Sequence, residues 1–304
     1  MNSGALKRLK VSLLTIALYT LCSALYLSFS GQAGARDWRT ASREPGGLAP
    51  DPADTQEAVV QVYAARAARW RGYFGVHTWI AVKRSGAQEF TIHEVMGFRL
   101  RRTGTAVVAS SREPDGRWYG SRPQLLSDLR GAGVDDIISR IEEAVANYPY
   151  PNTYRVWPGP NSNTFVAFVT REVPELRVDL PPTAIGKDYL GVIPVGTTPS
   201  GTGAQLSLFG AAGVLVGLEE GVEVNVLGLT FGVDPKSLSI KLPLLGRIGP
   251  RRDAKPGVLE PKQDAVPAQV EDALAPETQP SRLSAVADIA LQSVVADGSV
   301  SIAP

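Results

Sequence analysis

The stretch that decides the fold reads EAVVQVYAARA (57–67), YFGVHTWIAVK (73–83), EFTIHEVMGFRL (89–100) and TAVVAS (105–110). Each segment carries alternating or β-branched apolar residues, and turns containing glycine separate the segments. Such alternation is typical of half-buried strands. The pattern predicts an antiparallel sheet of at least three strands.

Helices are predicted to follow this sheet. The segments PQLLSDLRGAG (123–133) and VDDIISRIEEAVANY (134–148) place apolar residues three and four positions apart, as amphipathic helices do. A proline-rich stretch then ends at Asn161, and SNTFVAFVTREV (162–173) predicts a further helix. Strands followed by helices indicate an α+β fold, an antiparallel sheet with packed helices.

The next part of the chain changes character. From about residue 200, segments rich in Gly, Val and Leu predict a β-rich extension that continues to residue 249. Residues 206–218 are uncharged, but about 13 residues with three glycines are short for a membrane span. Residues 250–304 are rich in Pro, Ala, Glu and Asp, so we expect a disordered tail there.

The N-terminus carries a membrane-insertion signal. Residues 11–29 contain no charged side chain and follow Lys7, Arg8 and Lys10. Their length fits a retained anchor, because a spanning helix needs roughly 17 to 25 apolar residues. The small residues of Ala33-Gly34-Ala35 leave a cleaved signal peptide open as the alternative. Either outcome exports the rest of the chain.

This organisation divides the chain into four parts. We expect an anchor or signal segment at 1–35, a connector rich in Pro, Gly and Asp at 36–55, the α+β domain with its β-rich extension at 56–249, and the tail. We therefore predict that one N-terminal transmembrane helix anchors the chain in the membrane.

Composition excludes several function classes. The net charge of +1 gives no general attraction to nucleic acid, so no such partner is expected. The single cysteine, Cys22, lies in the N-terminal segment, which leaves the folded part without disulfides, thiolate zinc sites or cysteine nucleophiles. The sequence contains no P-loop and no dinucleotide-binding fingerprint, and neither a cofactor nor a metal is expected.

Two histidines are the candidate bases. His77 and His93 lie in neighbouring predicted strands, where alternation places His77 on one face with Trp79. His93 and Glu94 face opposite sides of their own strand, so only one of them can meet His77. A base needs a partner that orients its ring, and either residue could serve. The alternative is that each histidine is a satisfied structural residue.

Ser162 is the candidate nucleophile. It stands after Asn161 at the start of a predicted helix, where backbone N–H groups could stabilise an oxyanion. The alternative is purely structural, because Ser and Asn are favoured helix N-caps.

Four phrases resemble one family: YRVWPGPNSNTFVAFV (154–169), PPTAIGKDYLG (181–191), SGTGAQLSLFG (200–210) and VEVNVLGLTFGVDP (222–235), together with HTWIAVK at 77–83. In this order they are similar to DUF3750, a proteobacterial domain of unknown function, over about residues 38–249. Together with the N-terminal membrane-insertion signal, this resemblance leads us to expect a bacterial inner-membrane protein whose folded domain faces the periplasm.

A more distant similarity concerns mechanism. Permuted papain-like proteins, such as NlpC-type amidases and lecithin–retinol acyltransferases, carry a strand histidine, then a polar strand residue, and late in the chain an Asn-Cys pair that opens a helix. By this resemblance His77 is the base, His93 or Glu94 orients it, and Ser162 is the nucleophile. The chain departs from the pattern because serine replaces cysteine, and serine is scarcely ionised at neutral pH.

Two functions follow as expectations. The first is a serine hydrolase or acyltransferase acting on an amide- or acyl-bearing envelope molecule, such as a peptidoglycan peptide or a lipid. The second is a non-catalytic envelope binding or structural protein with a degenerate papain-like fold. The expected substrate contacts are Asn161, Asn163, Trp79 and Trp157.

Overall fold

The computed structural model describes residues 3–29, 39–250 and 257–258. The first of two sheets has six strands, in the order β13-β5-β1-β2-β3-β4. All neighbours pair antiparallel except the short outer strand β13, which pairs parallel to β5. The strands are β1 (Val59–Arg66), β2 (Val76–Lys83), β3 (Thr91–Val95), β4 (Val107–Ser111), β5 (Gln124–Arg130) and β13 (Gly257–Val258).

Strand β5 corrects the sequence-based prediction. The prediction of a helix over residues 123–133 was wrong, because Gln124–Arg130 pairs along β1, with Leu125 opposite Tyr63 and Leu129 opposite Val60. Leucine is a good helix former, but intrinsic propensity is a weak prior that tertiary contacts override. Here β1 is a central strand of the sheet, and β5 pairs with the edge of β1 that β2 leaves free.

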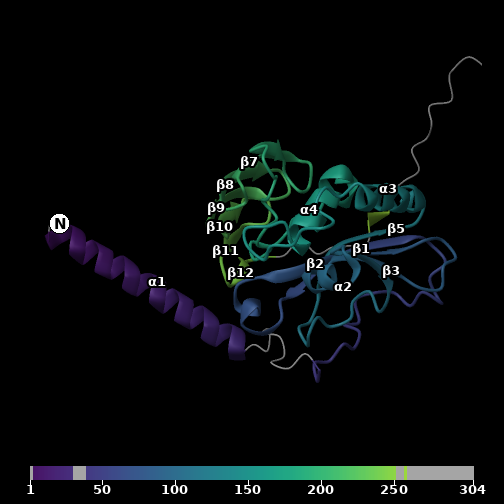
Figure 1. The fold of residues 1–304 in the computed structure, drawn as a ribbon, viewed down its shortest axis with the longest axis horizontal. Helices are drawn as coiled ribbons and strands as arrows, with labels where there is room; N and C mark the ends of the chain where they lie inside the picture. Colours follow the sequence, from purple (N-terminus) through teal and green to yellow (C-terminus); the bar gives the residue numbers. More distant parts are fainter. Residues whose placement is uncertain (1–2, 30–38, 251–256, 259–304) are drawn as a thin grey trace, which may run out of the picture. The chain divides into compact units, whose positions relative to one another are not determined.

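Two helices cover one face of this sheet (Figure 1). They are α3 (Val134–Ala146) and α4 (Ser162–Glu172), and both confirm the predicted helical spacing. Buried residues of the helices, such as Ile138 and Phe165, form one core with Val60 and Ile80 of the sheet. Short helical turns η1 (Arg69–Tyr73), η2 (Gly97–Arg99), α2 (Leu100–Thr103) and η3 (Pro174–Leu176) complete this part.

The opposite face of the first sheet carries a smaller core. Tyr63, Trp79 and Ile92 are buried there, and Trp118 packs against them. The β4–β5 connection therefore covers this face, since the Trp79 indole N–H donates to the carbonyl of Pro114 at 2.7 Å.

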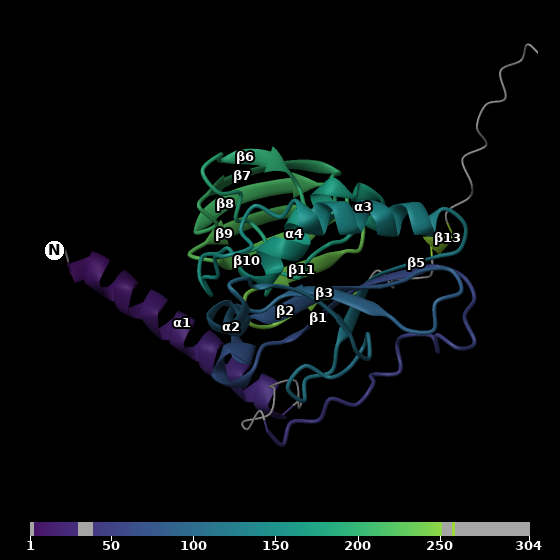
Figure 2. The same cartoon turned by 45° about the vertical axis from the view of Figure 1, so that its right-hand side comes forward.

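The predicted β-rich extension forms a second antiparallel sheet, a meander in which strands adjacent in sequence are adjacent in space (Figure 2). It begins slightly earlier than expected, near residue 195. Its strands are β6 (Val195–Thr197), β7 (Gly203–Leu208), β8 (Ala212–Gly217), β9 (Gly221–Val226), β10 (Leu229–Asp234), β11 (Ser239–Leu242) and β12 (Gly246–Ile248).

The interior between the second sheet and the segment that follows α4 is ionic. Lys187 and Lys241 are almost fully buried, and both contact the carboxylate of Glu223. Asp188 accepts hydrogen bonds from Lys187 and, at 2.8 Å, from the Asn225 amide. Buried charges are costly unless they are paired in this way, so the second sheet is held by polar contacts rather than by an apolar core.

One helix precedes the sheets. Helix α1, Ser3–Phe29, contains a stretch, Gly4–Phe29, that is long and apolar enough to cross a membrane or to be a signal sequence. Residues 39–55 of the predicted connector contain turns and an isolated bridge between Pro45 and Gly116. Most of the predicted disordered tail, and its apolar segment at 283–296, lies outside the described residues.

Candidate functional site

A cavity of about 670 Å³ opens where β2 begins and α4 begins. Most of its walls are apolar or aromatic, and they come from both sheets. They include Trp70, Phe98, Trp118, Tyr154 and Trp157, with Leu227 from the second sheet. Its volume and lining are typical of a small-molecule site, which combines apolar walls with a few polar groups. The polar groups include His77, Asn161, Ser162 and Asn163.

His77 is held by a buried carboxylate. Its Nε2 lies 2.7 Å from Oε2 of Glu94, whose side chain is fully buried. Arg112 donates from Nε and Nη2 to the other oxygen of Glu94, at 3.2 and 3.1 Å. Burial alone would raise the pKa of Glu94, but the contacts with His77 and Arg112 lower it below its ordinary value. Glu94 is therefore a carboxylate at neutral pH.

This pairing fixes the tautomer of His77. An ionised carboxylate only accepts hydrogen bonds, so Nε2 of His77 carries the hydrogen that points at Glu94. In the neutral ring the remaining nitrogen, Nδ1, then carries the lone pair. Within the described residues Nδ1 makes no hydrogen bond, which leaves it available as a proton acceptor.

Aromatic rings fix the plane of the imidazole. The His77 ring stacks on Trp118 with centroids 3.8 Å apart and an interplanar angle of 13°. The ring of Trp79, two residues along the strand, also stacks on the His77 ring, with centroids 5.8 Å apart and an interplanar angle of 25°. The ring therefore cannot turn away from Glu94 without disrupting both contacts.

The start of α4 is fixed by Asn161. Its side-chain oxygen accepts from the N–H groups of Asn163 and Thr164, and Thr164 Oγ1 accepts from the Asn161 N–H, forming a capping box. The Asn161 amide also donates to the carbonyls of Val156 and Ile185. Such caps supply partners for N–H groups that a helix start leaves unsatisfied. Asn161 therefore positions the turn that carries Ser162.

Strand β2 contacts the same turn through Thr78. The Thr78 hydroxyl lies 3.2 Å from the Ser162 carbonyl and 3.1 Å from Oδ1 of Asn163. Asn163 in turn donates to the carbonyl of Val76 at 3.1 Å. Because side chains alternate along a strand, Thr78 faces α4 while His77 faces away from it.

Ser162 and His77 line one cavity but make no direct hydrogen bond among the described residues. The two groups approach the cavity from different sides of β2. Glu94, one of the two predicted partners of His77, makes the contact. His93, the other, lies on the helix-covered face opposite Ile80 and does not reach His77.

The two predicted tryptophan contacts lie in different environments. Trp79 is fully buried in the smaller core and does not line the cavity. Trp157 does line it; half of its surface is exposed, and its indole N–H donates to the carbonyl of Leu227 at 2.9 Å. Among the described His, Cys, Asp and Glu side chains, no three gather as metal ligands.

Sequence reasoning missed Arg112 and Trp118. Both follow β4, in a connection that contains Pro114 and Gly116 and no periodic pattern. Their contacts with Glu94 and His77 arise only when this connection folds back over the sheet. A pattern search along the chain gives no signal for contacts of this kind.

The burial of His93 on the helix-covered face can be tested through the pH dependence of stability. Neither of its ring nitrogens has a partner among the described residues, and burial lowers its pKa although Glu142 acts in the opposite direction. A depressed pKa makes the folded state resist protonation, so stability is present above the unfolded pKa of about 6.5 and is lost as pH falls below it. We expect the free energy of unfolding of His93→Phe to decrease less than that of the wild type as pH falls below this value.

Urea unfolding of the wild type and the variant between neutral and mildly acidic pH measures the effect. At neutral pH the two should agree within about 1.5 kcal/mol, because the change conserves shape and removes unpaired nitrogens. If the free energies of unfolding of the two proteins changed with pH in the same way, a neutral, buried His93 would be contradicted.

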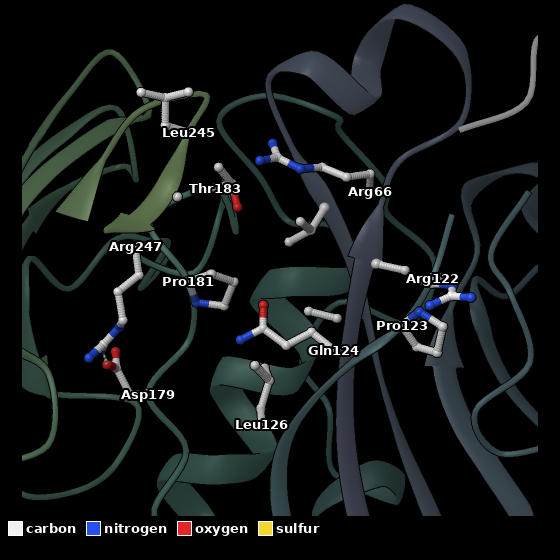
Figure 3. A pocket seen from close by; sticks show the side chains of 14 residues that line it. Arg66, Arg122, Pro123, Gln124, Leu126, Asp179, Pro181, Thr183, Leu245 and Arg247 are labelled. Atoms are coloured by element: carbon white, nitrogen blue, oxygen red, sulfur yellow. Dashed lines mark hydrogen bonds and ion pairs between the residues drawn. The ribbon is translucent and has the colours of Figure 1, made fainter. Parts of the chain in front are cut away.

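A second cavity, of about 390 Å³, lies between β1, β5 and the start of β12. Figure 3 shows Arg247 beside Asp179 on one side of it, with Arg66 and Arg122 on the other. Burial lowers the pKa of Arg66 to about 10. The Arg66 guanidinium donates to the carbonyl of Leu244 at 2.6 Å, which links the first sheet to the turn before β12. These contacts indicate a structural role for Arg66.

The family comparison covers most of the residues that line the cavity, but not those of the second sheet. Residues 57–189 match the family model described as "Protein of unknown function (DUF3750)". This match supports the expected resemblance to DUF3750. The DUF3750 region runs from β1 past α4 and contains His77, Glu94 and Ser162, whereas the second sheet follows it. Among the curated proteins and the solved structures, no match reaches significance.

Proposed function

We propose that this protein is an acyl-transfer enzyme of the bacterial cell envelope, a hydrolase or acyltransferase with Ser162 as nucleophile and His77 as base. The observation that carries the proposal is the Glu94–His77 pair, which fixes a free imidazole nitrogen on the cavity that Ser162 also lines. A base oriented by a buried carboxylate is the arrangement that serine nucleophiles require. The order of these residues along the chain is similar to that of permuted papain-like proteins.

In the proposed reaction Ser162 Oγ attacks a substrate carbonyl carbon and passes its proton to Nδ1 of His77. The leaving group takes that proton from His77 as the carbon–heteroatom bond breaks, and an acyl-serine remains. Water or an acceptor alcohol or amine then releases the acyl group by the same steps in reverse. Glu94 stays ionised and stabilises the imidazolium throughout.

The oxyanion would be held at the start of α4. Asn163 and Thr164 already donate their N–H groups to Asn161, and Phe165 donates to the Asn161 carbonyl. In the described structure the Ser162 N–H is the donor of this turn left without a partner. It points from the positive end of the helix and is the group available to an oxyanion.

Substrate binding must bring the serine and imidazole together. Because His77 faces away from α4 and its ring is held by Glu94 and Trp118, the Ser162 turn would have to move toward the imidazole. Catalytic hydrogen bonds that are absent or long in unliganded enzymes can form in the complex. Apolar cavity walls favour an acyl chain or another apolar group next to the reacting carbonyl. Export and membrane anchoring would give access to envelope lipids and to peptidoglycan peptides.

A second candidate is a non-catalytic binding protein of the envelope. The stacking of His77 on Trp118, and the hydrogen bond from Thr78 of β2 to the Ser162 carbonyl, favour it. In that case the same cavity holds an apolar ligand without turnover, and the Glu94–His77–Arg112 group serves to hold the cavity wall.

A fluorophosphonate probe, which reacts with activated serines, separates the two candidates. We expect it to label the wild type, to lose all labelling in Ser162→Ala, and to label His77→Ala far more weakly. Ser111→Ala removes an exposed serine of β4 and should label like the wild type. Equal labelling of all four proteins would contradict a serine nucleophile. Absent labelling, with saturable binding of a fluorescent fatty acid, would favour the binding protein.

A further inference from the structure

The outer face of the second sheet is apolar and exposed. Along β7 to β10 the outward side chains alternate with buried ones that are mostly polar, with Leu215 of β8 as an apolar exception. Leu206, Val214, Val224 and Phe231 point outward and are 43–49% exposed. Their registers place them opposite one another in one cross-strand row. The row continues unbroken across four strands.

A second row runs parallel to the first. Val216, Val222, Val233 and Ile240 are 40–53% exposed and are paired across β8 to β11. Two adjacent rows of Val, Leu, Ile and Phe form a contiguous patch, and monomeric soluble proteins rarely expose large patches of this kind. We call these eight residues the outer apolar face.

The hairpin tips at the ends of these strands are apolar as well. Phe209, Leu218, Leu227 and Leu238 are 61–82% exposed. Phe209, Leu227 and Leu238 also have positive φ, between 50° and 54°, where Gly, Asn or Asp normally stand. Apolar residues at such positions carry a conformational cost and gain nothing from contact with water.

The sheet is therefore reversed relative to a water-soluble one. In an antiparallel sheet with one solvated face, the apolar side chains point inward and the polar ones outward. Here Glu223, Asn225 and Lys241 point inward and are buried. An inward polar face with an outward apolar face is the pattern expected when the outside is not water.

Helix α1 indicates what covers this face. Ser23 and Leu27 are buried, one helical turn apart, and the Tyr19 hydroxyl donates to the carbonyl of Pro243 at 2.5 Å. Pro243 lies in the turn between β11 and β12. Tyr19 stands ten residues before the end of α1, about 15 Å along the helix. The edge of the second sheet thus contacts α1 well inside its apolar stretch.

We infer that the outer apolar face is a membrane-docking surface, seated on the lipid bilayer that α1 enters. A bilayer solvates α1 and also covers the adjoining face, and hairpin-tip Leu and Phe residues insert between acyl chains near the headgroups. A second copy of the chain would cover the sheet but would leave the contact between α1 and Pro243 without a role. This inference stands independently of any reaction in the cavity.

The full chain in nanodiscs of phosphatidylethanolamine and phosphatidylglycerol tests it. In a Cys22→Ser background, Val224→Cys carries an environment-sensitive fluorophore on the outer apolar face. Gln88→Cys, in the exposed β2–β3 turn of the first sheet, is the matched control. Both sites are on the surface, so both labelled chains should melt like the unlabelled protein.

We expect lipids with a nitroxide near the headgroup end to quench the Val224 label several-fold more than the Gln88 label, and aqueous iodide to show the reverse order. Iodide quenching of both labels alike would overturn the inference. Shielding of the Val224 label from both quenchers would also overturn it, and cross-linking between two labelled chains would then identify a second copy as the cover.

Discussion

Replacing Glu223 by glutamine is expected to lower the free energy of unfolding by about 3–5 kcal/mol. Glu223 is buried between Lys187 and Lys241, and each of its two oxygens contacts one lysine. Glutamine has nearly the same shape but carries no charge. Both ammonium groups would then stay buried with part of their compensation removed, which is the costly half of breaking a buried ion pair.

The effect should depend on pH. Burial alone would raise the pKa of Glu223, but Lys187 and Lys241 lower it below its ordinary value. A lowered folded pKa contributes stability above the unfolded value of about 4.3, and that stability is lost as pH falls through the folded pKa. The difference between wild type and Glu223→Gln is therefore expected to be full at neutral pH and to shrink in acid.

Urea unfolding in detergent, followed by tryptophan fluorescence, measures both effects. Glu142→Gln is the matched control, because Glu142 pairs with Arg84 on the surface, where each side chain is more than 40% exposed. Exposed pairs contribute about 0–1 kcal/mol. If Glu223→Gln costs no more than Glu142→Gln, the cluster does not hold the second sheet.

Glu94→Gln is expected to lower the free energy of unfolding by about 3 kcal/mol, at the lower end of the range for buried pairs. The lower value follows because Arg112 is partly exposed and water can compensate its charge. Glutamine also cannot neutralise His77 when the imidazole takes up a proton. The neutral amide therefore removes the stabilisation on which the proposed base depends.

Two measurements check this expectation. Glu113→Gln, the exposed neighbour of Arg112, should change stability by less than about 0.5 kcal/mol, as surface substitutions usually do. If Ser162 is the nucleophile, Glu94→Gln should also lose most fluorophosphonate labelling while remaining folded. A stable Glu94→Gln protein that labels at the wild-type rate would refute both the structural and the orienting role.

Much of the first sheet was predictable from alternation alone. The period of two located β1 to β4, and it also required that His93 and Glu94 face opposite ways, which limits His77 to one partner. Strand β5 was not predictable, because its leucine spacing fits a helix and its state depends on pairing with β1. Arg112 and Trp118 depend on a loop that folds back, which no local pattern encodes.

The second sheet shows a different limit. Its alternation is plain in GVEVNVLGLTFGV, and it predicts strands correctly. Alternation does not say which set of side chains faces inward, and the usual rule assigns Val to the interior. Here the rule fails, because Lys187 and Asp188 from the preceding segment supply the partners that bury Glu223 and Asn225.

The ionic cluster also determines where the chain can be divided. The family match ends at residue 189, between Lys187 and the strand that carries Glu223. A fragment cut there would keep Lys187 and Asp188 but would lose Glu223, one of the two carboxylates that compensate the buried ammonium group of Lys187. We therefore expect the matched region and the meander that follows to unfold together. The contacts of the folded part continue beyond the end of the shared sequence and beyond β12, since β13 still pairs with β5.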